Sequence, residues 1–236
     1  MIGRWIFIRG QAMGHRGWLA LAALFAIALC LLLPLRLVLG MAMPETVSAR
    51  SVEGSVWSGR IADLNAGPLP LGTVEAGLAP LPLLIGRPEF ALSREGFAAR
   101  IAPGRVRDAN GSVLLPDGLG GLPVTSLGFG GFSVVMDGRT CQEASGTLSL
   151  MLASLGPSLP DAMTLSGQAR CEKGALVVPM RGPQGMERLT LRIGGDGHWQ
   201  ADLTLAGLPQ ETADALKASG FDARPGGIGI GTSGTF

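Results

Sequence analysis

Few side chains in this sequence combine into a constellation that could catalyse a reaction. His198 is one of only two histidines, and it stands beside Trp199 directly after a glycine-rich turn at residues 194–197. A general base also needs a nucleophile and an orienting group, and the chain contains neither a G-x-S-x-G nor an H-E-x-x-H motif. We therefore interpret His198 and Trp199 as a cross-strand surface pair, and we predict that the protein is not an enzyme.

Cysteine chemistry is the second possibility. Cys30 lies within a long apolar run and is interpreted as a small apolar residue, whereas Cys141 and Cys171 both lie beside expected strands. In an oxidising compartment these two would form a disulfide. By closing a loop of about 30 residues it would stabilise the fold by roughly 3–4 kcal/mol. Two free buried thiols are the alternative.

No metal or cofactor site is expected from the sequence. The histidine nearest to the cysteines stands alone, and no C-x-x-C spacing occurs. The glycine-rich residues 226–231 are followed by neither a Lys-Ser pair nor a helix, so they do not form a phosphate-binding loop.

One long apolar run at residues 18–39 indicates on which side of a membrane the rest of the chain lies. Arg4, Arg9 and Arg16 precede it, and no acidic residue appears before Glu45. The run is close to the roughly 20 residues that cross a bilayer, and its basic flank is typical of the cytoplasmic side. We therefore expect a cytoplasmic head at residues 1–16, a single transmembrane anchor at 17–40 and a β-rich domain at 41–236 on the far side of the membrane.

A cleaved signal peptide is the alternative to an anchor, with its apolar core at residues 19–33. The apolar run is longer than the roughly 7–15 residues usual for a signal, and no clean A-x-A cleavage site follows it. These two observations favour the uncleaved anchor.

The composition indicates many short strands. The chain has 37 glycines and 16 prolines, and they are scattered between apolar residues rather than gathered in one tract, which indicates repeated turns. The net charge is +1, and charged residues make up 16% of the chain. No basic block follows the apolar run, so nucleic acid is excluded as a partner.

The alternation of apolar and polar residues predicts a mainly β fold, in which consecutive hairpins build an antiparallel, meander-like sheet that is curved or partly closed. A soluble helix is expected at residues 209–219, and the glycine-rich tail at 226–234 is expected to fray. Strands are expected at residues 47–56, 59–64, 73–78, 90–93, 97–101, 105–115, 129–136, 146–152, 163–169, 175–180, 187–193 and 198–206.

Two blocks after the apolar run form specific motifs. The first, EGSVWSGR at residues 53–60, reads as G-x-V-W-x-G and is built on Gly54, Trp57 and Gly59. The second, LAPLPLLIGR at residues 78–87, contains Pro80, Leu83, Leu84 and Gly86. A tryptophan that commonly stands before such a second block is absent here. With the short head, the single anchor and the cysteine pair, these blocks make the chain resemble protein N of the type II (general) secretion pathway.

This resemblance implies an accessory, non-enzymatic inner-membrane component of the machinery that moves folded periplasmic proteins across the outer membrane. Its energy would come from a separate cytoplasmic ATPase. Its partners would be other inner-membrane components of the type II secretion system, contacted through the periplasmic sheet or through the anchor.

The residue types in the two blocks point first to structural roles. Gly54 and Gly59 allow tight turns on both sides of Trp57, and we expect Trp57 to fill a core or to cover an end of the sheet. The apolar residues 80–84 are interpreted, in order of preference, as a core plug, a membrane-skimming loop or a partner surface.

A lipid-handling protein is the main alternative function. AsmA-like envelope proteins share the layout of a long antiparallel sheet on one amino-terminal anchor, and in them an apolar groove carries lipid. Strand alternation is compatible with either function, and the discriminating feature is a continuous apolar groove as opposed to a filled core. A pseudopilin is excluded because no acidic residue lies early in the apolar helix.

Overall fold

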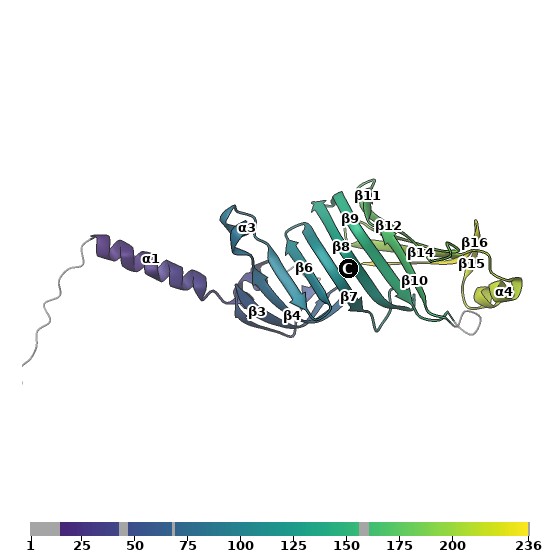
Figure 1. Cartoon of the computed structure of the whole chain (residues 1–236), viewed down its shortest axis with the longest axis horizontal. Coiled ribbons are helices and arrows are strands. Elements are labelled where there is room, and N and C mark those ends of the chain that lie inside the picture. Colours follow the sequence, from purple (N-terminus) through teal and green to yellow (C-terminus); the bar gives the residue numbers. More distant parts are fainter. Residues whose placement is uncertain (1–14, 43–46, 68, 156–160, 236) are drawn as a thin grey trace, which may run out of the picture.

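The computed structural model describes residues 15–42, 47–67, 69–155 and 161–235 (Figure 1). Two helices at the amino terminus lead into one long antiparallel sheet, and two short helices lie in connections between its strands. The helices are α1 (His15–Leu31), α2 (Leu35–Ala42), α3 (Pro80–Leu84) and α4 (Gln210–Ala218).

The sheet is a meander in which strands that follow each other in sequence also lie side by side. The order runs β1-β3-β4-β5-β6-β7-β8-β9-β10-β12-β13-β14-β16-β15, with β2 paired to β3 and β11 paired to β12. The strands are β1 (Val47–Ser48), β2 (Ser51–Ser55), β3 (Ser58–Ala66), β4 (Leu69–Leu78), β5 (Phe90–Arg94), β6 (Phe97–Ala102), β7 (Arg105–Leu114), β8 (Val124–Asp137), β9 (Thr140–Leu152), β10 (Met163–Gln168), β11 (Arg170–Glu172), β12 (Ala175–Arg181), β13 (Glu187–Ile193), β14 (His198–Leu205), β15 (Asp222–Arg224) and β16 (Gly227–Thr235).

Alternating side chains explain why these segments form a sheet with one apolar face. Along β14, Trp199, Ala201, Leu203 and Leu205 are buried while the residues between them face outward. The same alternation recurs along β13. The mainly β, antiparallel fold predicted from the sequence is therefore confirmed.

The sheet curves so that its carboxy-terminal strands cover the apolar face of its middle strands, and Figure 1 shows β14 and β16 behind β8 and β10. The loop between β7 and β8 helps to hold this arrangement, because the hydroxyl of Thr232 on β16 donates a hydrogen bond to the backbone carbonyl of Gly120. The first and last strands of the order, β1 and β15, are not paired with each other in the described part of the chain, so the sheet is not closed.

The carboxy-terminal tail is ordered as a strand, and the prediction that it frays is wrong. β16 pairs with β14 along almost its whole length, from Ile228 opposite Leu205 to Thr235 opposite His198. Ile228 is buried in the core. Tertiary pairing thus overrides the low strand preference of a glycine-rich segment.

The long apolar run does not form one continuous helix, which corrects the prediction for residues 18–39. The helix ends before Pro34, which has no backbone N–H and cannot continue the hydrogen-bond pattern, and Pro34 instead forms a β-bridge with Ser55. Within the described ranges, no helix is both long enough and apolar enough to cross a bilayer. Most of the expected cytoplasmic head at residues 1–16 lies outside the described residues.

Candidate functional site

The G-x-V-W-x-G motif forms the tight hairpin between β2 and β3. Ser55 lies opposite Ser58, and Gly54 lies opposite Gly59, so Val56 and Trp57 are the two turn residues. Gly54 has φ +89°, a backbone conformation that side chains with a Cβ rarely adopt. The motif therefore specifies a turn geometry at its first glycine.

The two glycines of the motif also provide space. A Cβ placed on Gly54 would lie 2.7 Å from the carbonyl oxygen of Ser58. A Cβ on Gly59 would lie 2.5 Å from Cδ2 of Leu35 and 2.7 Å from the carbonyl oxygen of Glu53. Any larger residue at either position would force backbone atoms apart.

The space beside Gly59 is occupied by the segment that follows α1. The backbone N–H of Val56 donates to the carbonyl of Leu33 at 2.8 Å, and Leu35 is completely buried in the hydrophobic core. We call residues 33–35 together with Gly54, Val56 and Gly59 the amino-terminal joint. The joint fastens the apolar amino-terminal helices to the first hairpin of the sheet.

Trp57 is half-buried at the end of the sheet and packs against the core. The neighbouring carbonyl of Val56 accepts a hydrogen bond from the N–H of Leu78 at 2.8 Å. A Cβ on Gly77 would lie 2.6 Å from the carbonyl oxygen of Trp57, so β4 also approaches this turn closely. The structural role predicted for Trp57 agrees with this position, and its contribution to stability stays a prediction.

The second motif block forms α3 and the turn after it, between β4 and β5. Pro80 begins the helix, a position that suits a residue with no N–H, and Leu83 and Leu84 end it. Gly86 has φ +71°, and a Cβ there would meet no atom within 4 Å. This glycine is therefore explained by the shape of the turn and not by close packing.

The prediction that residues 80–84 plug the core is wrong for the side chains that are described. Leu81 is 77% exposed and Leu83 is 38% exposed, and Ile85 just beyond the helix is 71% exposed. The sheet interior beneath is filled by other residues, among them Val74, Ala76 and Leu92. Of the three interpretations, the membrane-skimming loop and the partner surface remain.

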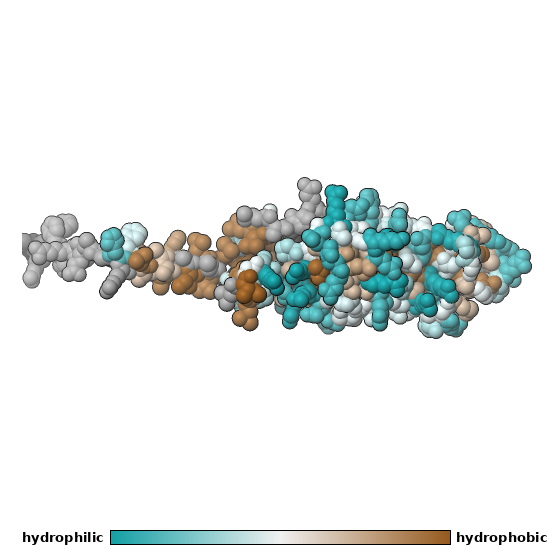
Figure 2. All heavy atoms as spheres, turned by 90° about the horizontal axis from the view of Figure 1, so that it is seen from above, coloured by the Kyte–Doolittle hydropathy of each residue, from teal (hydrophilic) through white to brown (hydrophobic). Residues whose placement is uncertain are grey.

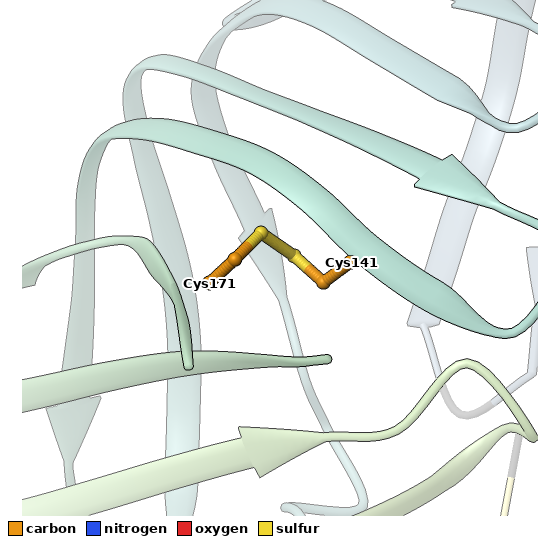
Figure 3. Close-up of a disulfide and its surroundings, with 2 residues drawn as sticks. All are labelled: Cys141 and Cys171. Carbon is orange, nitrogen blue, oxygen red and sulfur yellow. A yellow bond between two sulfur atoms is a disulfide. The ribbon is translucent and has the colours of Figure 1, made fainter. Parts of the chain in front are cut away.

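Cys141 and Cys171 form the predicted disulfide, which Figure 3 shows between β9 and the short strand β11. Their Cα atoms are 5.5 Å apart, within the usual range for a disulfide. The N–H of Cys141 donates to the carbonyl of Gly174 at 2.8 Å, which ties the start of β9 to the β11–β12 turn. β11 continues the line of β10 and also pairs with β12, so the bond joins β9 to the short segment that lies beside it.

The histidine at the start of β14 is exposed, and its backbone N–H donates to Oδ1 of Asp196 at 3.1 Å. The prediction that His198 and Trp199 form a surface pair is wrong for Trp199, which is buried and faces the interior. Gly120 and Gly234 lie against its ring, where side chains would collide with it. Among the described residues, no group of three or more His, Cys, Asp or Glu side chains is placed to hold a metal ion.

The interior of the curved sheet contains a cavity that the sequence patterns did not reveal. Its volume is about 240 Å³, and every side chain that lines it is apolar. Most of the lining comes from the middle and the carboxy-terminal strands, with additions from β4 and the β7–β8 loop, and it includes Phe129, Phe132, Leu150, Leu176, Leu191 and Trp199. The alternating strands indicated an apolar inner face, but only the curvature of the sheet encloses this space.

No curated protein and no solved structure matches this chain significantly. A family model does match, that of the type II secretion system protein N, over residues 45–231. The match begins just before β1 and ends within β16, so it includes both motif blocks, the disulfide and almost the whole sheet. The chain therefore belongs to the type II secretion system protein N family.

Proposed function

We propose that this protein is an accessory, non-enzymatic component of the type II secretion machinery at the inner membrane. It assists the export of folded periplasmic proteins across the outer membrane through contacts with other inner-membrane components. The observation that carries the proposal is the family match over residues 45–231, which extends along the sheet rather than over a local motif. Energy for export comes from another component.

The amino-terminal helix supports attachment to the inner membrane as part of this proposal. α1 extends away from the sheet in Figure 1, and Figure 2 shows that apolar residues dominate its surface. A helix that is apolar on all sides is not stable in water and needs an apolar environment. In the proposed orientation the chain before α1 is cytoplasmic and the sheet is periplasmic. The exposed apolar side chains are Trp18, Leu19, Leu21, Leu24, Phe25, Ile27, Leu29 and Leu31.

The outer face of the sheet supports a role in protein contacts. It carries charged residues in exposed ion pairs, such as Arg60 with Glu75 at 3.9 Å and Arg50 with Asp63 at 3.0 Å. Exposed ion pairs of this kind contribute little to stability. We therefore assign these charged residues a role in binding and orienting a partner protein.

Site-specific photo-crosslinking in cells tests the proposal. A photoreactive residue is placed at Ser58 in the first hairpin, at Arg87 after α3, at Gln200 on the outer face of β14 and at Lys217 on α4, all of which are exposed. Capture of other secretion subunits from a subset of these positions, together with loss of export when the protein is deleted, is the expected result. Normal export after deletion, with no subunit captured at any position, would reject the proposal.

Lipid handling is the second candidate, and the wholly apolar cavity is the observation that favours it. Its volume of about 240 Å³ is below the roughly 300–1,000 Å³ of typical ligand pockets. It is comparable to an engineered cavity of about 150 Å³ that accepts benzene. The cavity therefore has room for part of one acyl chain, and we rank lipid handling second.

Native mass spectrometry of the gently extracted protein separates the two candidates. Co-purified phospholipid that is displaced by Leu150→Phe, which reduces the cavity, would favour lipid handling. The control is Leu165→Phe, because Leu165 is equally buried but does not line the cavity. An absence of bound phospholipid in the unmodified protein would leave the assembly role as the better account.

A further inference from the structure

The segment around α3 is the one place in the described sheet domain where exposed apolar side chains gather. Leu81, Leu83 and Ile85 lie within five residues of each other, and each is exposed. The other exposed large apolar side chains beyond α2 are further apart: Leu114 on β7 and Met151 on β9 are separated by Ser126 on β8, and Met186 lies in the connection before β13. A scattered apolar residue on a surface needs no explanation, but a cluster indicates an interaction site.

The α3 loop, which we define as residues 79–87, is held in one shape by its own backbone. At its base the N–H of Ala79 donates to the carbonyl of Glu89 at 2.8 Å. At its end the N–H of Arg87 donates to the carbonyl of Pro82 at 3.0 Å. The apolar tip is therefore carried on a fixed support, and insertion into an apolar environment would cost little conformational entropy.

The position of the α3 loop indicates what that environment is. In Figure 1 the loop projects from the end of the sheet that lies next to α1, and α4 lies at the opposite end. In Figure 2 the apolar residues at this end of the sheet lie beside those of α1, whereas most of the remaining surface in this view is polar. A membrane that receives α1 would therefore lie close to the tip of the α3 loop.

We propose that the α3 loop inserts its apolar tip into the surface of the same bilayer to which α1 attaches, so that the sheet contacts the membrane at a second point. This inference rests on the membrane attachment in the proposed function. Between Leu78 and Gly86 the loop carries no charged residue. Arg87 follows and is exposed, in a position to meet anionic head groups.

The charges near the base of the loop are compatible with this contact. The nearest acidic residue, Glu89, is mostly buried, and its carboxylate lies 3.9 Å from the guanidinium of Arg100. An exposed, unpaired carboxylate would be repelled by an anionic membrane surface. Partial burial and pairing with Arg100 reduce that repulsion.

The test uses the full-length protein in vesicles of phosphatidylethanolamine and phosphatidylglycerol. Cys141 and Cys171 are bonded, so Cys30→Ser leaves a single introduced cysteine for an environment-sensitive NBD label. The label is placed by Ile85→Cys, with two controls. Leu114→Cys matches Ile85 in exposure and lies on β7 near the middle of the sheet order, and Met186→Cys is an exposed apolar position before β13.

We expect a nitroxide on the lipid head-group region to quench most of the NBD fluorescence at position 85 and to leave positions 114 and 186 unchanged. Adding Leu81→Asp to the Ile85→Cys protein should abolish this quenching. In a vesicle flotation assay, which measures membrane attachment, the same protein should still float with the vesicles. Leu114→Asp in its place should leave the quenching intact.

Two other outcomes would overturn the inference, and they differ in what they say about the proposed function. If the protein floats with the vesicles but position 85 is not quenched, membrane attachment stands and the second contact is wrong. If the protein does not float, attachment itself fails and the inference fails with it. Quenching of equal size at all three labelled positions would indicate nonspecific adsorption of the sheet and would also overturn it.

Discussion

The two ends of the sheet each carry a short helix, and the two helices meet their surroundings in opposite ways. α4 contains Glu211, Asp214 and Lys217, with Lys217 paired to Asp214 at 2.9 Å, and it buries Leu216 almost completely. α3 has no charged residue and exposes Leu81. α4 is thus an ordinary amphipathic helix with one face in water, whereas α3 has no face suited to water.

The residues that hold each end of the sheet together also differ. At the α4 end, the N–H of Phe221 donates to the carbonyl of Leu216 at 3.1 Å, and both side chains lie in the core. At the other end the corresponding buried leucine, Leu35, is contributed by α2 and not by α3. At the α1 end, α2 supplies the buried leucine and α3 supplies the exposed one. At the α4 end, a single helix has both a buried face and an exposed face.

The largest expected effect is at the amino-terminal joint. Leu35→Ala should lower the free energy of unfolding by about 4 kcal/mol, because it leaves a cavity in the core. Thermal unfolding of the purified full chain, followed by tryptophan fluorescence, measures the change. Leu37→Ala is the control, because Leu37 lies in the same helix but is exposed. Equal effects of the two substitutions would mean that α2 is not part of the fold.

Removal of the disulfide should have the next largest effect. Cys141→Ser with Cys171→Ser should destabilise the sheet by roughly 3–4 kcal/mol through the added freedom of the unfolded chain. Hydrogen exchange should show the largest loss of protection around β9 to β12, because the bond lies among the later strands and not at the first hairpin. A loss of protection centred on the first hairpin would contradict this division.

The turn glycine of the first motif allows a matched comparison. Gly54→Ala combines a positive φ with a backbone collision, whereas Gly72→Ala has a positive φ but meets no atom within 4 Å. We expect Gly72→Ala to cost about 1 kcal/mol and Gly54→Ala to cost about 3 kcal/mol, because it also displaces backbone atoms in a tightly packed region. The difference in unfolding midpoint measures the packing contribution. Equal midpoints would show that only the φ angle matters.

Truncation of the motif tryptophan should have a smaller effect. Full burial of a tryptophan would predict a loss of roughly 3–5 kcal/mol, but Trp57 is half-buried, so we expect Trp57→Ala to cost about 2 kcal/mol. Chemical denaturation of the full chain provides the measurement. A cost below about 1 kcal/mol would mark Trp57 as a surface residue and would make it a candidate for partner contact.

Polar substitution at the tip of α3 should have the smallest effect on folding. Leu81→Ser with Ile85→Ser should change stability by less than about 0.5 kcal/mol, since both side chains are exposed. Leu216→Ser in α4 should cost several times more, because it places a hydroxyl in the core. If the two α3 substitutions unfold the protein, α3 would be a structural element and the contrast between the two ends would disappear.

Local patterns predicted much of this fold. The boundaries of β13, Glu187–Ile193, follow from strict alternation, and the end of α4 follows from Gly220, which acts as a stop signal. The disulfide could be predicted because only two cysteines lay outside the apolar run. The strand and the helix depend on residues close together in the sequence, and the disulfide depends on the small number of cysteines.

The features that were missed depend on residues far apart in the sequence. β16 is a strand because β14 lies beside it, and Trp199 is buried because Gly120 and Gly234 leave space for its ring. The helix ends before Pro34 for a local reason, but the β-bridge between Pro34 and Ser55, which accompanies the burial of Leu35 in the core, joins residues far apart. No periodicity within any one of these segments contains that information.

The amino-terminal joint has a mechanical consequence. The carbonyl of Leu33 is bonded to the hairpin, and only Leu32 lies between it and the end of α1, so no slack linker separates the apolar helix from the sheet. A tilt or rotation of α1 would pass directly into β2 and β3 and from there along the continuous meander.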